Sequence, residues 1–147
     1  MKALSLWQPW ASLWACGRKS YETRHWSTPY RGPLAIHAAQ KLCVEIDDAL
    51  REILEDEFGG HWARELPRGA LIGHGDLVNC LATDHLHVDA DERAQGNFTP
   101  GRYAWDMANR KLLAAPIPWR GHQSLFDVPD EIITGAPPPP SPQGKLL

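Results

Sequence analysis

The sequence predicts a small α+β protein in which short strands form a β-barrel flanked by helices. Three features indicate this fold class. Short apolar stretches of strand length recur along the chain, two segments have the three-to-four-residue spacing of helices, and glycine- and proline-rich turns separate them. With 147 residues, of which 43% are hydrophobic, the chain has the size and apolar content of one domain with a substantial core.

The first helix is expected to begin near Pro9, because proline lacks only an N–H group that the first turn of a helix leaves unused. Trp10, Leu13 and Trp14 follow with the spacing of one apolar helical face. Gly17 then ends the segment, as glycine commonly does after a helix. Most of the seven tryptophans are therefore expected in the core, with at most two in contact with a ligand.

A strand predicted over residues 20–26 carries the charged side chains that follow this helix. Side chains alternate along a strand, so Glu22, Arg24 and Trp26 are expected on one side of it. Lys19 lies directly before the strand, where its amine would emerge at the mouth of a cleft. A lysine amine removed from water can act as a base, whereas a neighbouring carboxylate favours the ammonium form.

The rest of the chain is expected to complete the scaffold. A helix from about Val44 to Phe58 carries acids on its outer face, and residues 83–99 are polar without periodicity, which predicts a long loop or lid. Further strands are predicted at residues 2–6, 34–39, 70–81, 103–107, 112–119 and 125–127, with a turn at Asn109 and Arg110. Residues 1–134 form the predicted domain, and residues 135–147 a proline-rich, disordered tail.

The charges of the chain are distributed unevenly. Residues 17–41 hold five Lys or Arg and one acid, whereas residues 42–66 hold eight acids and two Arg. Such an asymmetry favours a cationic working face and a solvated acidic face, with ordinary surface charge as the alternative. The sequence shows no apolar run of membrane-spanning length and no signal-peptide pattern. Three cysteines without a C-x-x-C pair indicate reduced thiols, so a cytoplasmic location is expected.

Four short segments together resemble a known family: WQPWA at residues 7–11, GRK at 17–19, ETR at 22–24 and YRGP at 30–33. As a set they resemble the ASCH (activating-signal-cointegrator homology) family of the PUA-like superfamily, over about residues 2–128. The resemblance implies a PUA-like β-barrel. It also implies a basic cleft, lined by the G-x-K-x-x-E-x-R motif, that binds RNA, DNA or a modified nucleobase.

The resemblance also implies an alternative activity. Some small bacterial relatives are amidohydrolases that deacylate 4-N-acylated cytidines, using the motif lysine, a threonine three residues later as the proposed nucleophile, and a distant glutamate. Lys19 matches the lysine, but Glu22 occupies the threonine position, and a carboxylate cannot simply replace that hydroxyl. Asp91 and Glu92 are the candidates for the distant acid. The alternative is thus a small metal-independent hydrolase, an amidohydrolase or a weak ribonuclease, that uses Lys19 and Glu22.

The candidate ligand contacts follow from the chemistry of each side chain. Glu22 can accept from an exocyclic amine or activate water, and Arg24 can bind a phosphate or carbonyl, unless the two form only a structural salt bridge. The remaining candidates are Trp10, Trp26 and Tyr30 for stacking and Arg31 and Lys41 for phosphate. No cofactor or metal is expected: His85 and His87 have the spacing of metal ligands, but nothing else in the chain securely completes a site with them. A protein-interaction adaptor remains a third hypothesis, supported by the proline-rich tail.

Overall fold

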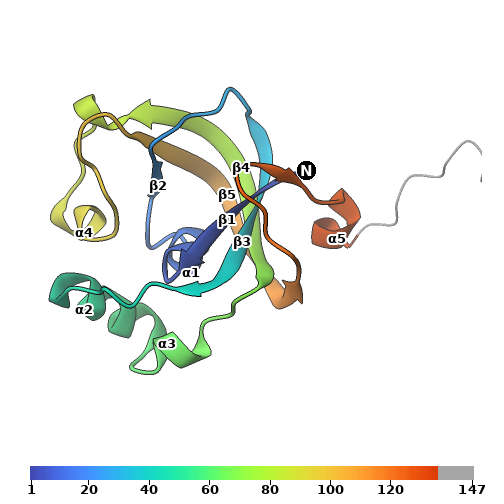
Figure 1. The fold of residues 1–147 in the computed structure, drawn as a ribbon, viewed down its shortest axis with the longest axis horizontal. Coiled ribbons are helices and arrows are strands. Elements are labelled where there is room, and N and C mark those ends of the chain that lie inside the picture. Colours follow the sequence, from blue (N-terminus) through green and yellow to red (C-terminus); the bar gives the residue numbers. More distant parts are fainter. Residues whose placement is uncertain (136–147) are drawn as a thin grey trace, which may run out of the picture.

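The computed structural model describes residues 1–135, and these form a mixed α+β fold around one six-stranded sheet (Figure 1). The strands are β1 (Lys2–Gln8), β2 (Tyr21–Arg24), β3 (Gly32–Leu42), β4 (Ala70–Ala82), β5 (Tyr103–Pro118) and β6 (Phe126–Asp127). The helices are α1 (Trp10–Ala15), α2 (Asp48–Phe58), α3 (Trp62–Glu65), α4 (Ala90–Arg93) and α5 (Asp130–Thr134), with a short 3₁₀ helix η1 (Thr83–His85). The predicted α+β class is confirmed.

The strand order is β2-β5-β4-β3-β1-β6, with β1 and β3 parallel and the other neighbours antiparallel. The sheet therefore ends at β2 and at β6, and the predicted closure into a barrel is not confirmed. The two sides of the opening nevertheless approach each other, because Arg24 Nη2 on β2 donates a hydrogen bond of 2.9 Å to the Ser5 carbonyl on β1. That side-chain bridge stands where a closed barrel would have a ladder of backbone hydrogen bonds.

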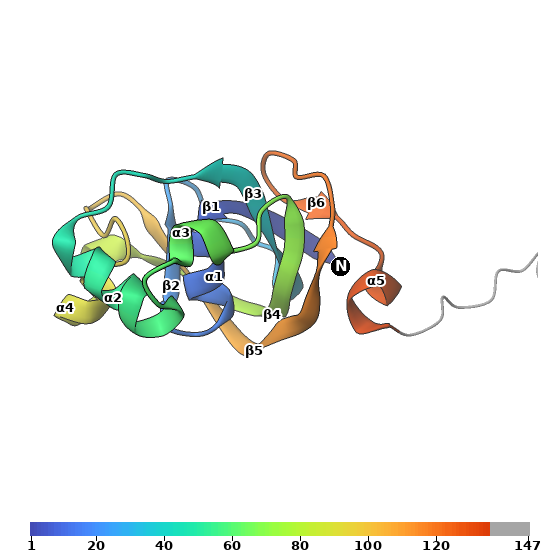
Figure 2. The same ribbon diagram turned by 90° about the horizontal axis from the view of Figure 1, so that it is seen from below.

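The core lies between α1 and the curved sheet. Trp14 on α1 and Trp105 on β5 are fully buried in the same apolar cluster, as expected for core tryptophans. On its other side α1 presents Leu13 to a second cluster with Leu50 and Leu54 of α2. Helices α2 and α4 lie at one end of the molecule, α3 lies nearer its middle, and α5 lies at the other end beside the N-terminus (Figure 2).

Strand β5 corrects one prediction. The sequence predicted two strands turning at Asn109 and Arg110, but the structure has one long strand that pairs with β4 along its length. His74 pairs with Lys111 and Asp76 with Ala108, so Asn109 and Arg110 together oppose the single residue between His74 and Asp76. Asn109 has a φ of 55° there. The polar pair thus makes a β-bulge that bends the strand, where the sequence suggested a reversal of the chain.

Other boundaries also differ from the prediction. Helix α2 begins at Asp48 and not near Val44, because the Asp47 side chain accepts a hydrogen bond of 2.9 Å from Leu50 N and caps the helix. The predicted loop at residues 83–99 contains η1 and α4, and α3 and α5 were not predicted. Of the predicted tail, residues 136–147 lie outside the described part of the chain. Within residues 1–135 no helix is both long and apolar enough to cross a membrane.

Candidate functional site

The candidate site begins where α1 ends. Gly17 has a φ of 86°, a conformation that favours glycine, and its N–H donates to the Trp14 carbonyl. Lys19 N then donates a hydrogen bond of 3.0 Å to the Leu13 carbonyl. This turn directs Lys19 inward and not toward solvent, so that the residue is only 1% exposed. The glycine and lysine of the sequence motif therefore place a cationic amine inside the fold.

Three charged side chains meet at this point, and we call Lys19, Glu22 and Arg24 the charged triad. The Lys19 amine forms a close ion pair with Glu22 Oε1, and Arg24 Nε lies 3.1 Å from Glu22 Oε2. The Arg24 contact is an ion pair without hydrogen-bond geometry. The Lys19 and Glu22 side chains are 2% and 12% exposed, so each compensates a charge that burial would otherwise penalise. The lysine, glutamate and arginine of the motif therefore lie in direct contact.

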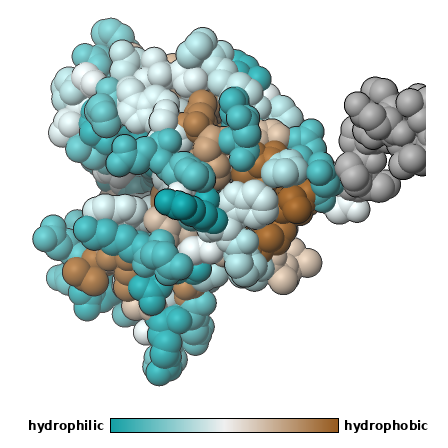
Figure 3. Space-filling view, turned by 45° about the vertical axis from the view of Figure 1, so that its right-hand side comes forward, coloured by the Kyte–Doolittle hydropathy of each residue, from teal (hydrophilic) through white to brown (hydrophobic). Residues whose placement is uncertain are grey.

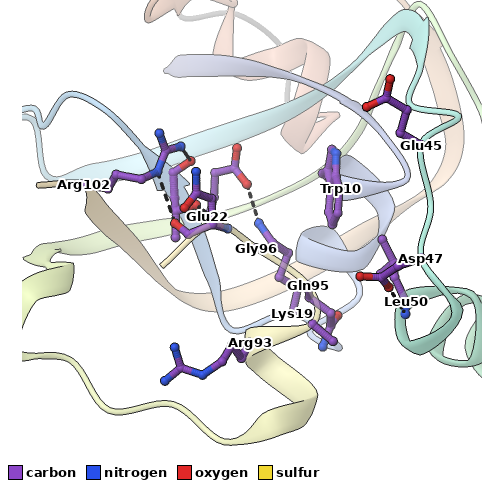
Figure 4. A pocket seen from close by; sticks show the side chains of 13 residues that line it. Trp10, Lys19, Glu22, Glu45, Asp47, Leu50, Arg93, Gln95, Gly96 and Arg102 are labelled. Carbon is purple, nitrogen blue, oxygen red and sulfur yellow. Dashed lines mark hydrogen bonds and ion pairs between the residues drawn. The ribbon is translucent and has the colours of Figure 1, made fainter. Parts of the chain in front are cut away.

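Two members of the triad, Lys19 and Glu22, line a cleft of about 420 Å³, whereas Arg24 lies outside its lining. Trp10, Lys19, Glu22 and Thr23 line it from α1 and the start of the sheet, and the lysine amine lies 5.8 Å from the centre of the Trp10 indole. Figure 4 shows Trp10 and Arg102 on opposite sides of Glu22. In the space-filling view, an indentation separates the lower lobe, where Figure 1 places α2 and α3, from the rest of a largely hydrophilic face (Figure 3).

The segment of residues 83–102, which we call the lid segment, forms the second wall of the cleft. Glu92 anchors it, because its carboxylate accepts hydrogen bonds from Ser20 N at 2.7 Å and Tyr21 N at 3.1 Å. Gln95 is fully buried, donates to the Arg18 carbonyl, and leaves its Oε1 without a partner in residues 1–135. Gln95 also contributes to the lining of the cleft, although its Oε1 itself is sealed from solvent.

Arg102, at the end of the lid segment, is a cleft residue that the sequence did not indicate. Its Nη2 donates to the Thr23 carbonyl at 3.1 Å and its Nε to the Asn97 carbonyl at 3.2 Å. The pairing of Arg24 with Tyr103 in the sheet brings it there. Arg93 and Gln95 also line the cleft from this segment. No periodicity or motif in residues 83–102 marks these side chains; the register between β2 and β5 places Arg102, and the Glu92 anchor places Arg93 and Gln95.

The remaining predicted site residues lie outside the lining of the cleft. Trp26 packs edge-on against Trp105, with ring centres 4.8 Å apart. Tyr30 and Arg31 order their own loop: the Tyr30 hydroxyl bonds the Pro33 carbonyl, and Arg31 Nη1 donates to Tyr30 O at 2.8 Å.

Two further predicted positions also lie away from the cleft. Lys41 stands 4.2 Å from the centre of the exposed Trp7 ring. Of the candidate distant acids, Glu92 is the lid anchor, and Asp91 forms an ion pair of 3.2 Å with Arg18.

The charge of the cleft is mixed, whereas the resemblance implied a basic one. Its lining contains Lys19, Arg93 and Arg102 but also Glu22, Glu45 and Asp47. In Figure 4 the two arginines lie on one side and Glu45 and Asp47 on the other. The cleft therefore has a cationic and an acidic rim, with the Lys19–Glu22 pair between them. Among the described residues, no group of three or more His, Cys, Asp or Glu could hold a metal ion.

Comparison with known proteins agrees with the motif. A family model for the ASCH domain matches residues 4–117, which is most of the chain. The proteins named Activating signal cointegrator 1 from Homo sapiens and Mus musculus are each 28% identical to this chain over 138 residues. The matched region covers 90% of this chain but only 23% of each relative, so the chain corresponds to a small part of those proteins. The chain belongs to the ASCH domain family.

Proposed function

We propose that this ASCH domain binds a nucleobase in the cleft beside the charged triad, the base being part of RNA or DNA or of a free nucleoside. The observation that carries the proposal is the buried ion pair of Lys19 and Glu22 at a hollow with an indole wall. Ligand sites of this type join an apolar surface to a few fixed polar groups, commonly in volumes of about 300–1,000 Å³. The 420 Å³ of the cleft suits one base with its sugar.

The hydrogen-bonding capacity of the triad suits the edge of a base. A carboxylate offers about four acceptor positions and an ammonium three donors. Lys19 and Glu22 use one position each on one another, and Arg24 faces the second carboxylate oxygen. Glu22 therefore retains acceptor capacity for an exocyclic amine, and Lys19 retains donors for a neighbouring carbonyl or ring nitrogen. Stacking on Trp10 would add about 1–3 kcal/mol.

The two rims of the cleft suggest how a nucleotide is oriented. Arg102 and Arg93 can approach a phosphate, whereas Glu45 and Asp47 repel one. The sugar-phosphate is thus expected on the arginine side, with the base directed toward Lys19. Membership of the ASCH family supports this assignment, because the family resemblance implies binding of nucleic acid or a modified base.

A binding experiment tests the proposal. Nucleoside monophosphates and short labelled RNA and DNA strands are titrated at low salt with the wild-type protein and with Lys19→Ala and Arg24→Ala. A lost charge-assisted hydrogen bond is worth about 1.5–3 kcal/mol, so Lys19→Ala is expected to weaken binding by roughly 10- to 150-fold. Lys111→Ala, at an exposed lysine outside the cleft lining, is the matched control. Circular dichroism verifies folding of each variant. Undetectable binding, or binding unaffected by Lys19→Ala and Arg24→Ala, contradicts the proposal.

A second candidate function is a metal-independent hydrolase, and the buried contact between the Lys19 amine and the Glu22 carboxylate favours it. Glu22 would take a proton from the water that attacks the acyl carbon, and Lys19 would protonate the exocyclic nitrogen as the C–N bond breaks. A turnover assay with 4-N-acetylcytidine tests the amidohydrolase, and cleavage of a labelled RNA tests the ribonuclease. Rates equal to those of Lys19→Ala would exclude both.

A further inference from the structure

We propose that a single-stranded polynucleotide leaves the cleft along a surface groove and stacks a second base on Trp7. This inference rests on the proposed function, because it takes the base in the cleft as its starting point. It adds a second binding site at residues that neither the family match nor the relatives assign. It also specifies the ligand as a single strand longer than one nucleotide.

The groove is continuous with the cleft. A hollow of about 260 Å³ shares Trp10, Glu22, Thr23 and Arg102 with the cleft. It shares Ser5, Trp7, Arg24 and His25 with a hollow of about 530 Å³. That hollow in turn shares lining residues with one of about 570 Å³ next to the loop before β6. We call this path the exit groove, and its floor and walls include Ser5, Trp7, Arg24, His25, His122 and Gln123. It begins at Arg102, on the rim where the phosphate is expected.

The charge of the exit groove differs from that of the cleft. Among residues 1–135, Glu22 is the one acid that lines any of its three hollows, and it is already neutralised by Lys19 and Arg24. Arg24, Arg102 and Arg120 contribute cations along the path. The opposite rim carries Glu45 and Asp47, which repel phosphates. These charges therefore favour a path of the polyanion from the cleft along the exit groove over a path past Glu45 and Asp47.

Trp7 provides a stacking surface in this groove. It is 46% exposed although its neighbours Leu6 and Gln8 are buried. The β1–β3 register shifts between Leu6 and Gln8, so Trp7 lies at an irregularity of the ladder. Lys41 Nζ stands 4.2 Å from its ring centre, where the ammonium can also meet the phosphate of a stacked nucleotide. Exposed aromatics with adjacent cations are the usual platform for single strands, whose base faces are free.

The test compares ligands of different length with the full chain. Cytidine monophosphate and labelled single strands of three and six nucleotides, in RNA and in DNA form, are titrated with wild type, Trp7→Ala and Lys41→Ala. The hexamer is expected to bind more tightly than the monophosphate and to show a steeper dependence on salt. Trp7→Ala is expected to weaken hexamer binding by roughly 5- to 150-fold and to remove the gain with length. Leu112→Ala, an exposed apolar residue outside every hollow of the groove, is the control.

The outcomes separate this inference from the proposed function. If the monophosphate binds in a Lys19-dependent manner but the hexamer binds no more tightly, the groove is refuted and the cleft stands. Hexamer binding that is unaffected by both Trp7→Ala and Lys41→Ala also refutes it. If no ligand binds, the proposed function itself fails. Tighter binding of a hexamer duplex than of either single strand would likewise contradict the stacking of a free base on Trp7.

Discussion

Replacing Lys19 by methionine should destabilise the protein, because it removes one member of a buried ion pair. The unbranched methionine side chain is one atom shorter and fills most of the same space. The Lys19 side chain is 2% exposed and that of Glu22 is 12% exposed. Removing one partner of a buried pair commonly costs about 3–5 kcal/mol, because the other charge stays buried without compensation. Arg24 Nε remains 3.1 Å from Glu22 Oε2 and offsets part of this loss. We therefore expect a loss of about 3 kcal/mol.

Urea unfolding measures this loss as a change in the free energy of unfolding. For a chain of this size, about 3 kcal/mol corresponds to a melting temperature lowered by roughly 6–12 °C. The double variant Lys19→Met/Glu22→Gln no longer buries an unpaired carboxylate. Its loss in free energy of unfolding should therefore be smaller than the summed losses of the two single variants, by about 1 kcal/mol or more. A loss below about 1 kcal/mol for Lys19→Met would refute the reasoning, and so would a double-variant loss equal to the sum of the two single losses.

Three further predictions concern the surroundings of the site. Burial lowers the pKa of His37, so the folded state keeps it neutral while the unfolded chain takes up a proton below about pH 6.5. The difference in free energy of unfolding between wild type and His37→Gln, measured with urea, should therefore be full above that pH and shrink as the pH falls. A difference that stays constant with pH would contradict this. Glu92→Gln should weaken the anchor of the lid segment and speed amide hydrogen exchange in residues 83–102; unchanged exchange would show that the anchor is dispensable. Burial raises the pKa of Cys16, so at pH 8 iodoacetamide should alkylate it more slowly than a cysteine in a free peptide. Mass spectrometry follows the reaction, and equal rates would contradict a buried environment of this thiol.

The local part of the site could be predicted from the sequence. Glu22 and Arg24 are two residues apart on a strand, so their side chains share a side, and Gly17 sets the turn that brings Lys19 to them. These relations depend only on neighbours in the chain. The tryptophans at helical spacing were likewise expected in the core, and Trp14 is fully buried there.

The other wall of the cleft could not be predicted, because it comes from distant segments. Arg102 and Gln95 belong to a polar stretch without periodicity; the pairing of β2 with β5 places Arg102, and the contacts of Glu92 and Gln95 with residues 18–21 place Gln95. The polar pair at Asn109 and Arg110 was interpreted as a turn, since such residues tolerate positive φ and favour turns. A bulge uses the same preference without reversing the chain, and a single sequence does not distinguish the two.

Chemical-shift mapping with a nucleotide ligand tests the central claim most directly. In ¹H–¹⁵N spectra, addition of cytidine monophosphate should shift the Trp10 indole N–H and the backbone amides of Lys19, Glu22, Thr23 and Gln95, which line the cleft. The amides of α5, at the far end of the molecule, should not move. No shifts at millimolar ligand, or shifts confined to surfaces away from Lys19 and Glu22, would contradict the assignment of this cleft as a base-binding site.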